Sequence, residues 1–127
     1  MYLLDSNIII FYLKKDTETV KMIDKLDVNF CTSVVCIGEV LEGLSSKKSP
    51  KKTKVFEQLI KNIKIIPIDL ETTRVFAKTR KNLRKRGKLI GDMDTFIAAT
   101  CISNKYTLIT HNIKHFSRIS ELKIHKS

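Results

Sequence analysis

The sequence predicts an α/β fold in which a parallel β-sheet is covered by helices on both faces. The first observation behind this prediction is that strand-like and helix-like segments alternate along the whole chain. The second is that the strand-like segments are apolar throughout, as in strands buried on both faces. The third is the length of 127 residues, which suits one domain with one core. We therefore expect a single domain over residues 1–127.

Five segments are expected to form strands. The first, MYLLD, is an apolar run that ends in an acid, and the later ones are similarly short and apolar. The predicted strands are residues 1–5, 29–34, 64–68, 106–110 and a short last segment at 122–125. No internal repeat or low-complexity segment interrupts this order.

The first three helices follow from apolar spacing and capping signals. Ser6 or Asn7 can cap a helix from Ile8 to Leu13, and residues 17–27 have apolar side chains near helical spacing. A third helix is expected from about Val35 to Leu44. Gly43 is expected to close it, and a basic loop is expected over residues 45–53.

Three more helices are expected in the second half of the chain. Apolar residues repeat at intervals of three and four from Val55 to Ile63, which indicates an amphipathic helix. Asp69 is expected to cap the next helix, which Gly87 ends. The last predicted helix follows Asp94 and continues to about Ser103.

Composition narrows the classes of function. With 24 Lys and Arg against 13 Asp and Glu, the net charge is +11, which favours a polyanionic partner such as nucleic acid over solubility alone. The three cysteines form no C-x-x-C pair and are expected to be buried free thiols. No run is long enough to span a membrane, and the N-terminus lacks signal-peptide features, so we expect a cytoplasmic protein with no membrane partner.

Acidic residues follow apolar strands or precede apolar helices, and these are the candidate functional residues. Asp5 ends the first strand, where ligands bind in open parallel sheets, but it could also be a helix cap. Glu39 lies in an apolar helical stretch. Asp92 and Asp94 start a helix, where the dipole alone favours acids. Asn112 follows the fourth strand and could be a metal ligand or a turn residue.

Carboxylates that meet in one cleft repel each other, so without a cation at least one should have a raised pKa. A hard divalent ion such as Mg²⁺ or Mn²⁺ removes this conflict and prefers oxygen ligands. A basic surface around an acidic pocket would then hold a phosphate chain next to the metal.

Four motifs in register resemble the PIN-domain ribonucleases, most closely the VapC toxins of bacterial toxin–antitoxin pairs. The matching pieces are Leu4-Asp5-Ser6-Asn7, Ser33 with Glu39-Val and Gly43, Ile90-Gly-Asp-Met-Asp94-Thr-Phe-Ile-Ala-Ala99, and Leu108-Ile-Thr110-His-Asn112 with His115-Phe116. The resemblance covers essentially the whole chain. It implies a three-layer fold with a parallel five-stranded sheet and an acidic quartet at its carboxyl edge.

The resemblance also implies roles for individual residues. Asp5, Glu39 and Asp94 would hold the metal, and Asn112 stands where relatives often have a fourth acid. Ser6, Asn7 and Asp92 would be auxiliary residues. The implied reaction is metal-assisted hydrolysis of RNA phosphodiester bonds. RNA-binding residues are expected in two basic segments and are Lys47, Lys48, Arg80, Arg84, Lys85 and Arg86.

The resemblance further implies partners. These are RNA, with tRNA a common target among VapC toxins, a cognate antitoxin protein, and a second copy of the chain in a homodimer. Two alternatives remain open: a non-catalytic RNA-binding module with this fold, and a metal-dependent nuclease without a toxin role. A receiver-like domain is disfavoured, because such domains have adjacent acids after the first strand, where this chain has Leu4-Asp5-Ser6. A phosphatase or a DNA nuclease would use the same metal chemistry.

Overall fold

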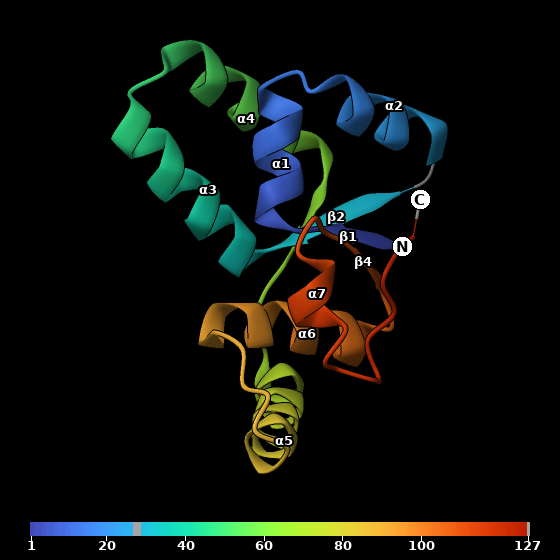
Figure 1. The fold of residues 1–127 in the computed structure, drawn as a ribbon. Coiled ribbons are helices and arrows are strands. Elements are labelled where there is room, and N and C mark those ends of the chain that lie inside the picture. The colour runs from blue at the N-terminus through green and yellow to red at the C-terminus, as the bar shows by residue number, and fades with distance from the viewer. Residues whose placement is uncertain (27–28, 127) are drawn as a thin grey trace.

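A computed structural model describes residues 1–26 and 29–126 and shows a parallel sheet with helices on both faces (Figure 1). The strands lie in the order β3-β2-β1-β4 and all pairs are parallel. Their bounds are Tyr2–Leu4 for β1, Phe30–Ser33 for β2, Lys64–Ile66 for β3 and Thr107–Ile109 for β4. The predicted α/β fold class is confirmed.

The expected fifth strand is reduced to a single bridge. Within the described residues the sheet has four strands, and Ile124 forms an isolated parallel bridge with Leu108 of β4. The segment over residues 122–125 therefore lies where a fifth strand would lie. It pairs through Leu108 alone, which donates to Lys123 O at 2.9 Å and accepts from His125 N at 2.8 Å. Turns on its N-terminal side leave it too short for a ladder.

Seven helices surround the sheet in the described part of the chain. They are α1 Ser6–Leu13, α2 Thr17–Leu26, α3 Val34–Lys47, α4 Pro50–Asn62, α5 Leu70–Lys85, α6 Asp92–Asn104 and the short α7 Ile113–Phe116. No described helix has the length and apolarity needed to cross a bilayer.

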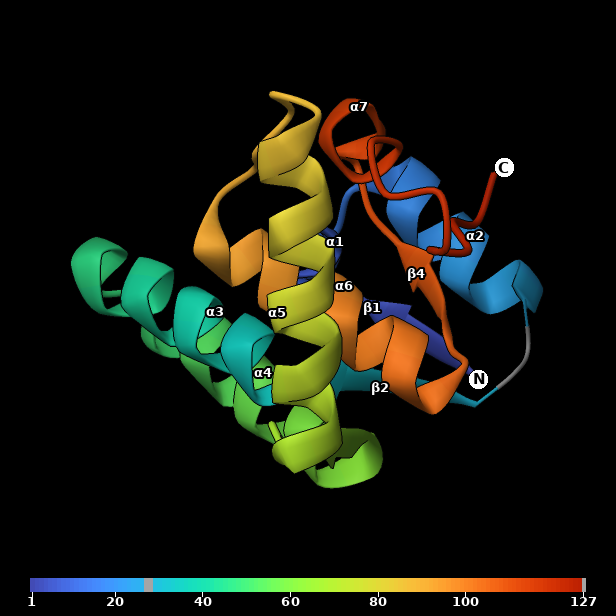
Figure 2. The same cartoon turned by 90° about the horizontal axis from the view of Figure 1, so that it is seen from below.

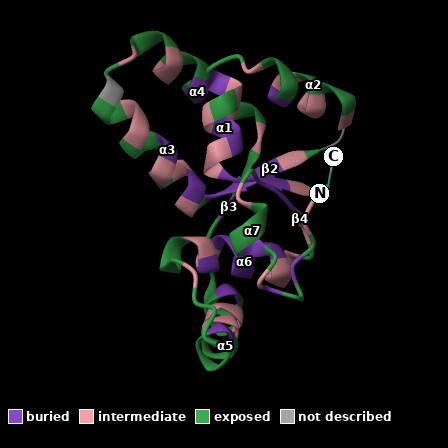
Figure 3. Cartoon of the chain, viewed as in Figure 1, coloured by how far each residue is buried: buried purple, intermediate pink, exposed green. Residues whose placement is uncertain are grey.

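Alternate residues of the strands pack into two hydrophobic cores, one on each face of the sheet. Leu3 packs with Ile97 of α6 and Phe116 of α7, whereas Leu4 packs with Ile8 of α1 and Phe56 of α4. The buried strands at the centre and the exposed outer helix faces are visible in Figure 3. Burial of both strand faces explains why the strands read as unbroken apolar runs.

Helix α5 forms an outer layer against α6, as the view in Figure 2 shows. Phe76 of α5 stacks on Phe96 of α6 with 3.9 Å between the ring centroids. The predicted boundaries of α5 are confirmed: Asp69 accepts from Thr72 N at 2.9 Å, and Gly87 has a φ of 65°. That left-handed conformation suits glycine at the end of a helix.

The basic loop expected over residues 45–53 is wrong, because helices occupy most of it. Gly43 lies inside α3, which continues to Lys47, and α4 begins at Pro50. The break falls at Lys48, which has a φ of 45°, followed by Ser49, which caps α4 by accepting from Lys52 N at 3.4 Å. The Ser-Pro start signal of the next helix, rather than Gly43, sets this boundary.

Candidate metal centre

Asp5 lies at the carboxyl end of β1, at the point where the strand order reverses. The chain runs from β1 through β2 to β3 on one side, and β4 then returns to the other side of β1, which is where open α/β sheets bind ligands. Asp5 is also the N-cap of α1, so capping and a position at this edge are compatible. Its side chain is 3% exposed.

Four donors surround the Asp5 carboxylate. Oδ1 accepts from Ser6 N at 2.8 Å and from the Cys36 thiol at 3.9 Å. Oδ2 accepts from Thr110 Oγ1 at 2.7 Å and from Asn7 Nδ2 at 3.2 Å. These bonds fix the carboxylate and favour its ionised form.

Asn7 and Thr110 link the start of α1 to the segment after β4. Asn7 Oδ1 accepts from His111 N at 3.1 Å, and Thr110 Oγ1 accepts from Asn112 N at 2.9 Å. The sequence analysis did not select Thr110. A signal was available, because Thr110 ends an apolar strand in the same way as Asp5 does.

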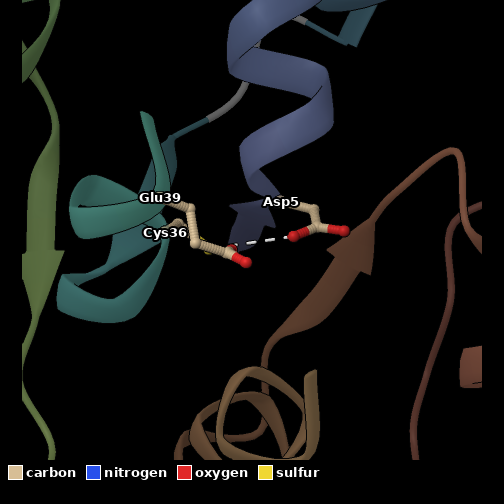
Figure 4. Close-up of side chains that lie close together, drawn as sticks. All are labelled: Asp5, Cys36 and Glu39. Carbon is tan, nitrogen blue, oxygen red and sulfur yellow. Dashed lines mark hydrogen bonds between the residues drawn. The ribbon is translucent and has the colours of Figure 1, made fainter. Parts of the chain in front are cut away.

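Glu39 and Cys36 reach Asp5 from α3. Ser33 caps this helix, accepting from Cys36 N at 3.0 Å, and Glu39 follows Cys36 by three residues, so both side chains lie on one helix face. Asp5, Cys36 and Glu39 each offer one ligand atom, a carboxylate oxygen or the thiol sulfur, and these three atoms lie within 4.8 Å of one another. In Figure 4 the Glu39 carboxylate extends from α3 toward Asp5.

Asp94 lies in the first turn of α6 and is partly buried. It is outside the group whose ligand atoms lie within 4.8 Å of one another. Its charge nevertheless acts on this group, because Asp94 raises the pKa of Glu39 and Asp5 raises the pKa of Asp94. The three carboxylates therefore share one electrostatic environment.

Burial is the main cause of the raised pKa of each acid. Hydrogen bonds from Thr110 and Ser6 lower the pKa of Asp5 and partly offset the effect of burial. The Ser6 side chain lowers the pKa of Glu39, whereas the negative charges of Asp5 and Asp94 raise it further. The Asp5 charge raises the pKa of Asp94 further, and His115 lowers it. Raised pKa values are what acids that share a pocket show without a cation.

The donor set fits a divalent cation. Glu39 Oε1 is buried and has no hydrogen-bond partner among the described residues, although a buried polar atom normally has one. A cation bound by Asp5 and Glu39 would satisfy this atom and offset the repulsion from Asp5 and Asp94 that adds to the raised pKa of Glu39.

Asp92 and Asn112 have other partners. Asp92 lies in the first turn of α6, and its Oδ1 accepts from Arg80 Nε of α5 at 3.0 Å. Asn112 precedes α7, and its Nδ2 lies 3.0 Å from His115 Nδ1. Asp92 does not belong to the close group of ligand atoms.

The predicted RNA-binding residues fall at separate places. Lys48 is exposed between α3 and α4, and the side chain of Lys47 lies outside the described part of the structure. Arg84, Lys85 and Arg86 lie at the end of α5, where Arg86 donates to Arg118 O. A depression of about 410 Å³ adjoins this end and is lined by Arg86, Lys88, Lys114, Ser117 and Arg118.

Comparison with known proteins identifies the class to which this fold and this acidic edge belong. The sequence pattern of the PIN domain matches residues 2–122, so the chain belongs to the PIN-domain family. Within that family it is similar to the "Ribonuclease VapC1" of Methanocaldococcus jannaschii, at 35% identity over 97% of this chain and 85% of that protein. It is also similar to the "Ribonuclease VapC2" of Rickettsia felis, at 29% identity over 96% of this chain and 94% of the other.

Solved structures agree with this assignment. The fold is similar to a chain of VapBC2 from Rickettsia felis bound to a promoter DNA fragment, with a TM-score of 0.89, 26% identity and coverage of 98% and 96% of the two chains. A chain of DNA-bound VapBC from Salmonella typhimurium matches with a TM-score of 0.85, 25% identity and coverage of 98% and 96%. The resemblance inferred from the sequence motifs is confirmed.

Proposed function

We propose that this chain is a divalent-cation-dependent endoribonuclease and the toxin of a VapBC-type toxin–antitoxin pair. The observation that carries the proposal is the carboxylate cluster at the carboxyl edge of the sheet, where Asp5 and Glu39 lie together and Glu39 Oε1 is buried without a partner. Similarity to proteins named ribonuclease VapC supports RNA as the substrate.

Asp5, Glu39 and Asp94 are proposed to hold the cation, Mg²⁺ or Mn²⁺. When bound, such an ion lowers the pKa of a coordinated water and neutralises charge on phosphate oxygens. Ser6 and Asn7 hold the Asp5 carboxylate in place. Asp92 and Asn112 are proposed as auxiliary residues, with Asn112 offering an uncharged oxygen where relatives often have an acid.

Basic side chains are proposed to hold the RNA backbone. The residues that the sequence predicts for this role are Lys47, Lys48, Arg80, Arg84, Lys85 and Arg86. The depression beside the end of α5 adds Lys88, Lys114 and Arg118 to this set. Phosphate contacts position an RNA strand without reading its bases.

The proposal extends to partners and location. Structures of VapBC complexes among the similar folds support a cognate antitoxin as partner. A relative from Shigella flexneri is named a tRNA(fMet)-specific endonuclease, with 25% identity over 96% of this chain and 94% of that protein, which supports tRNA as a candidate substrate. We also propose a homodimer, a single PIN domain over residues 1–127 and action in the cytoplasm.

The test is RNA cleavage by the purified chain with Mg²⁺, Mn²⁺ or EDTA. Cleavage is expected with either ion and not with EDTA, and Asp5→Asn and Asp94→Asn should each lower the rate at least about 100-fold, since each removes a charge from the cation site. Lys61→Ala, at an exposed position near the end of α4, is the control. Cleavage that survives EDTA or both substitutions would contradict the proposal.

Substrate comparison separates the alternatives. Binding of RNA without cleavage would indicate a non-catalytic module, and preferential cleavage of DNA or of small phosphate esters would indicate a different hydrolase. Growth arrest on expression without an antitoxin, abolished by Asp5→Asn, is the expected sign of the toxin role.

A further inference from the structure

The thiol of Cys36 lies within the carboxylate cluster. Its Sγ is 3.9 Å from Asp5 Oδ1, and it lies within 4.8 Å of the ligand oxygens of both Asp5 and Glu39; Figure 4 shows the three side chains together. We propose that Cys36 is an additional ligand of this site and makes it prefer a thiophilic divalent cation, such as Zn²⁺ or Cd²⁺, over Mg²⁺. This inference rests on the proposed function, which makes Asp5 and Glu39 ligands.

The distance between Cys36 and Asp5 suits such an ion. Zinc binds carboxylate oxygen at about 2.0–2.2 Å and thiolate sulfur at about 2.3 Å, so two such ligands in tetrahedral geometry are about 3.5 Å apart. The observed 3.9 Å between Cys36 Sγ and Asp5 Oδ1 requires a shift of only a few tenths of an ångström. One sulfur and the oxygens of Asp5 and Glu39 leave a fourth tetrahedral position, which is the place for the proposed ligand Asp94.

The fold fixes the position of this thiol. Cys36 is fully buried in the first turn of α3, where Ser33 Oγ accepts from its backbone N at 3.0 Å and lies 3.2 Å from its Sγ. Glu39 lies one turn further along the same face, with the unpartnered Oε1. Cys31 and Cys101 are equally buried, but in the described residues neither belongs to a group of metal-ligand atoms.

Binding replaces the S–H bond of Cys36 with a sulfur–metal bond, and the thiol proton leaves to solvent. The cation stays divalent, so no oxidant or reductant is required. Mg²⁺ is a hard ion that takes oxygen ligands and does not gain from the sulfur. Cys36 therefore strengthens binding of soft cations selectively.

The experiment is a Cd²⁺ titration of the full chain after treatment with EDTA, followed by the ultraviolet sulfur-to-cadmium charge-transfer absorption. We expect a band that saturates at one equivalent and that Zn²⁺ displaces. Cys36→Ser should abolish the band and lower Zn²⁺ affinity about tenfold or more, with Mg²⁺ affinity changed less than about twofold. Cys101→Ala, at an equally buried cysteine, should keep the band.

A second variant keeps the test decisive if Cys36→Ser does not fold. In Cys31→Ala/Cys101→Ala, Cys36 is the sole thiol, so a band must come from it. A band that persists in Cys36→Ser, no band in the double variant, or equal Zn²⁺ affinity in wild type and Cys36→Ser would overturn the inference. Mg²⁺-dependent RNA cleavage without a band refutes this inference alone, whereas a band without RNA cleavage refutes the proposed function alone.

Discussion

At the scale of single residues, Thr110 connects the two strands that flank the site. Its hydroxyl donates to Asp5 Oδ2 at 2.7 Å and accepts from Asn112 N at 2.9 Å, and the residue is 5% exposed. This buried hydroxyl bonds to both a carboxylate and a backbone amide. It therefore stabilises the negative charge of Asp5 and the conformation of the segment after β4.

Thr110→Val removes this hydroxyl while it keeps the shape of the side chain. We expect the free energy of unfolding to fall by about 1.5–3 kcal/mol, since hydrogen bonds to charged groups contribute this much. Thr110→Ser keeps the hydroxyl and is the control. Urea unfolding measures both, and equal stability of the valine variant and wild type would contradict the prediction.

The raised pKa of Asp94 predicts how stability depends on pH and metal. Its ordinary value is 3.8, and because the folded pKa is higher, the folded state binds the proton more tightly than the unfolded state. The contribution of Asp94 to stability therefore falls as pH rises from the ordinary value through the folded pKa, and the penalty is complete at neutral pH.

Asp94→Asn should therefore raise the Tm of the EDTA-treated protein at neutral pH, and this gain should vanish below the ordinary pKa of 3.8. Mg²⁺ should stabilise wild type more than the variant. Thermal unfolding by circular dichroism checks both effects. Asp92→Asn is the matched control, because it removes an exposed acid that pairs with Arg80; a lower Tm for Asp94→Asn at neutral pH would refute the prediction.

The sequence predicted the acids of the site better than their neighbours. Asp5, Glu39 and Asp94 stand out because a charge within or beside an apolar run is unusual. Cys36 does not stand out, since a buried thiol is an ordinary core residue. Thr110 follows an apolar strand as Asp5 does but has no charge to mark it. Only the pairing of β1 with β4 and the packing of α3 place them at the Asp5 carboxylate.

At the scale of elements, the turn between α3 and α4 shows how competing boundary signals are resolved. Gly43 lies within α3, where a Cβ would meet no atom within 4 Å. Gly87 ends α5 with a φ of 65°. Both glycines were expected to end a helix, but only Gly87 has a left-handed backbone conformation.

This contrast predicts opposite effects of alanine. Gly43→Ala should stabilise the protein by about 0.5–1 kcal/mol, because alanine loses less backbone entropy inside a helix. Gly87→Ala should destabilise it by about 1–2 kcal/mol, because an L-residue is strained in the left-handed region. Chemical denaturation of both variants is the measurement, and effects of the same sign would contradict the prediction.

Most elements were predictable because their signals are local. The apolar strands, the Asp69 cap and the Gly87 stop each depend on a few adjacent residues, and the structure has them as expected. The extension of α3 to Lys47 and the reduction of residues 122–125 to one bridge were not predictable in this way. At the end of α3, Gly43 and the Ser-Pro start of α4 are competing signals, and the Ser-Pro start sets the boundary. The single bridge of residues 122–125 depends on pairing with β4.

At the scale of the whole molecule, a strongly basic chain carries an acidic site and a separate basic depression. The net charge is +11, and the depression beside α5 and α7 is lined by four cationic residues, Arg86, Lys88, Lys114 and Arg118. The arginines there are held by hydrogen bonds, with Arg118 donating to Leu89 O at 3.1 Å. This arrangement suits a phosphate chain that passes the site.

Lys88→Ala and Lys114→Ala should each weaken RNA binding and reduce its salt dependence. For single-stranded RNA in EDTA, the slope of log K against log salt concentration should fall by about 0.7 for each lost phosphate contact. Lys61→Ala, at the end of α4 on the other face of the sheet, should leave the slope unchanged. Equal slopes for all three variants would place the RNA elsewhere.

The bond between Thr110 and Asp5 joins residues 105 positions apart, and β4 is among the last elements to emerge during synthesis. A nascent chain released before residue 110 lacks both the strand that flanks β1 and the hydroxyl that secures its terminal acid. Toxicity is therefore expected only after translation is nearly finished. Prematurely terminated products should lack cleavage activity.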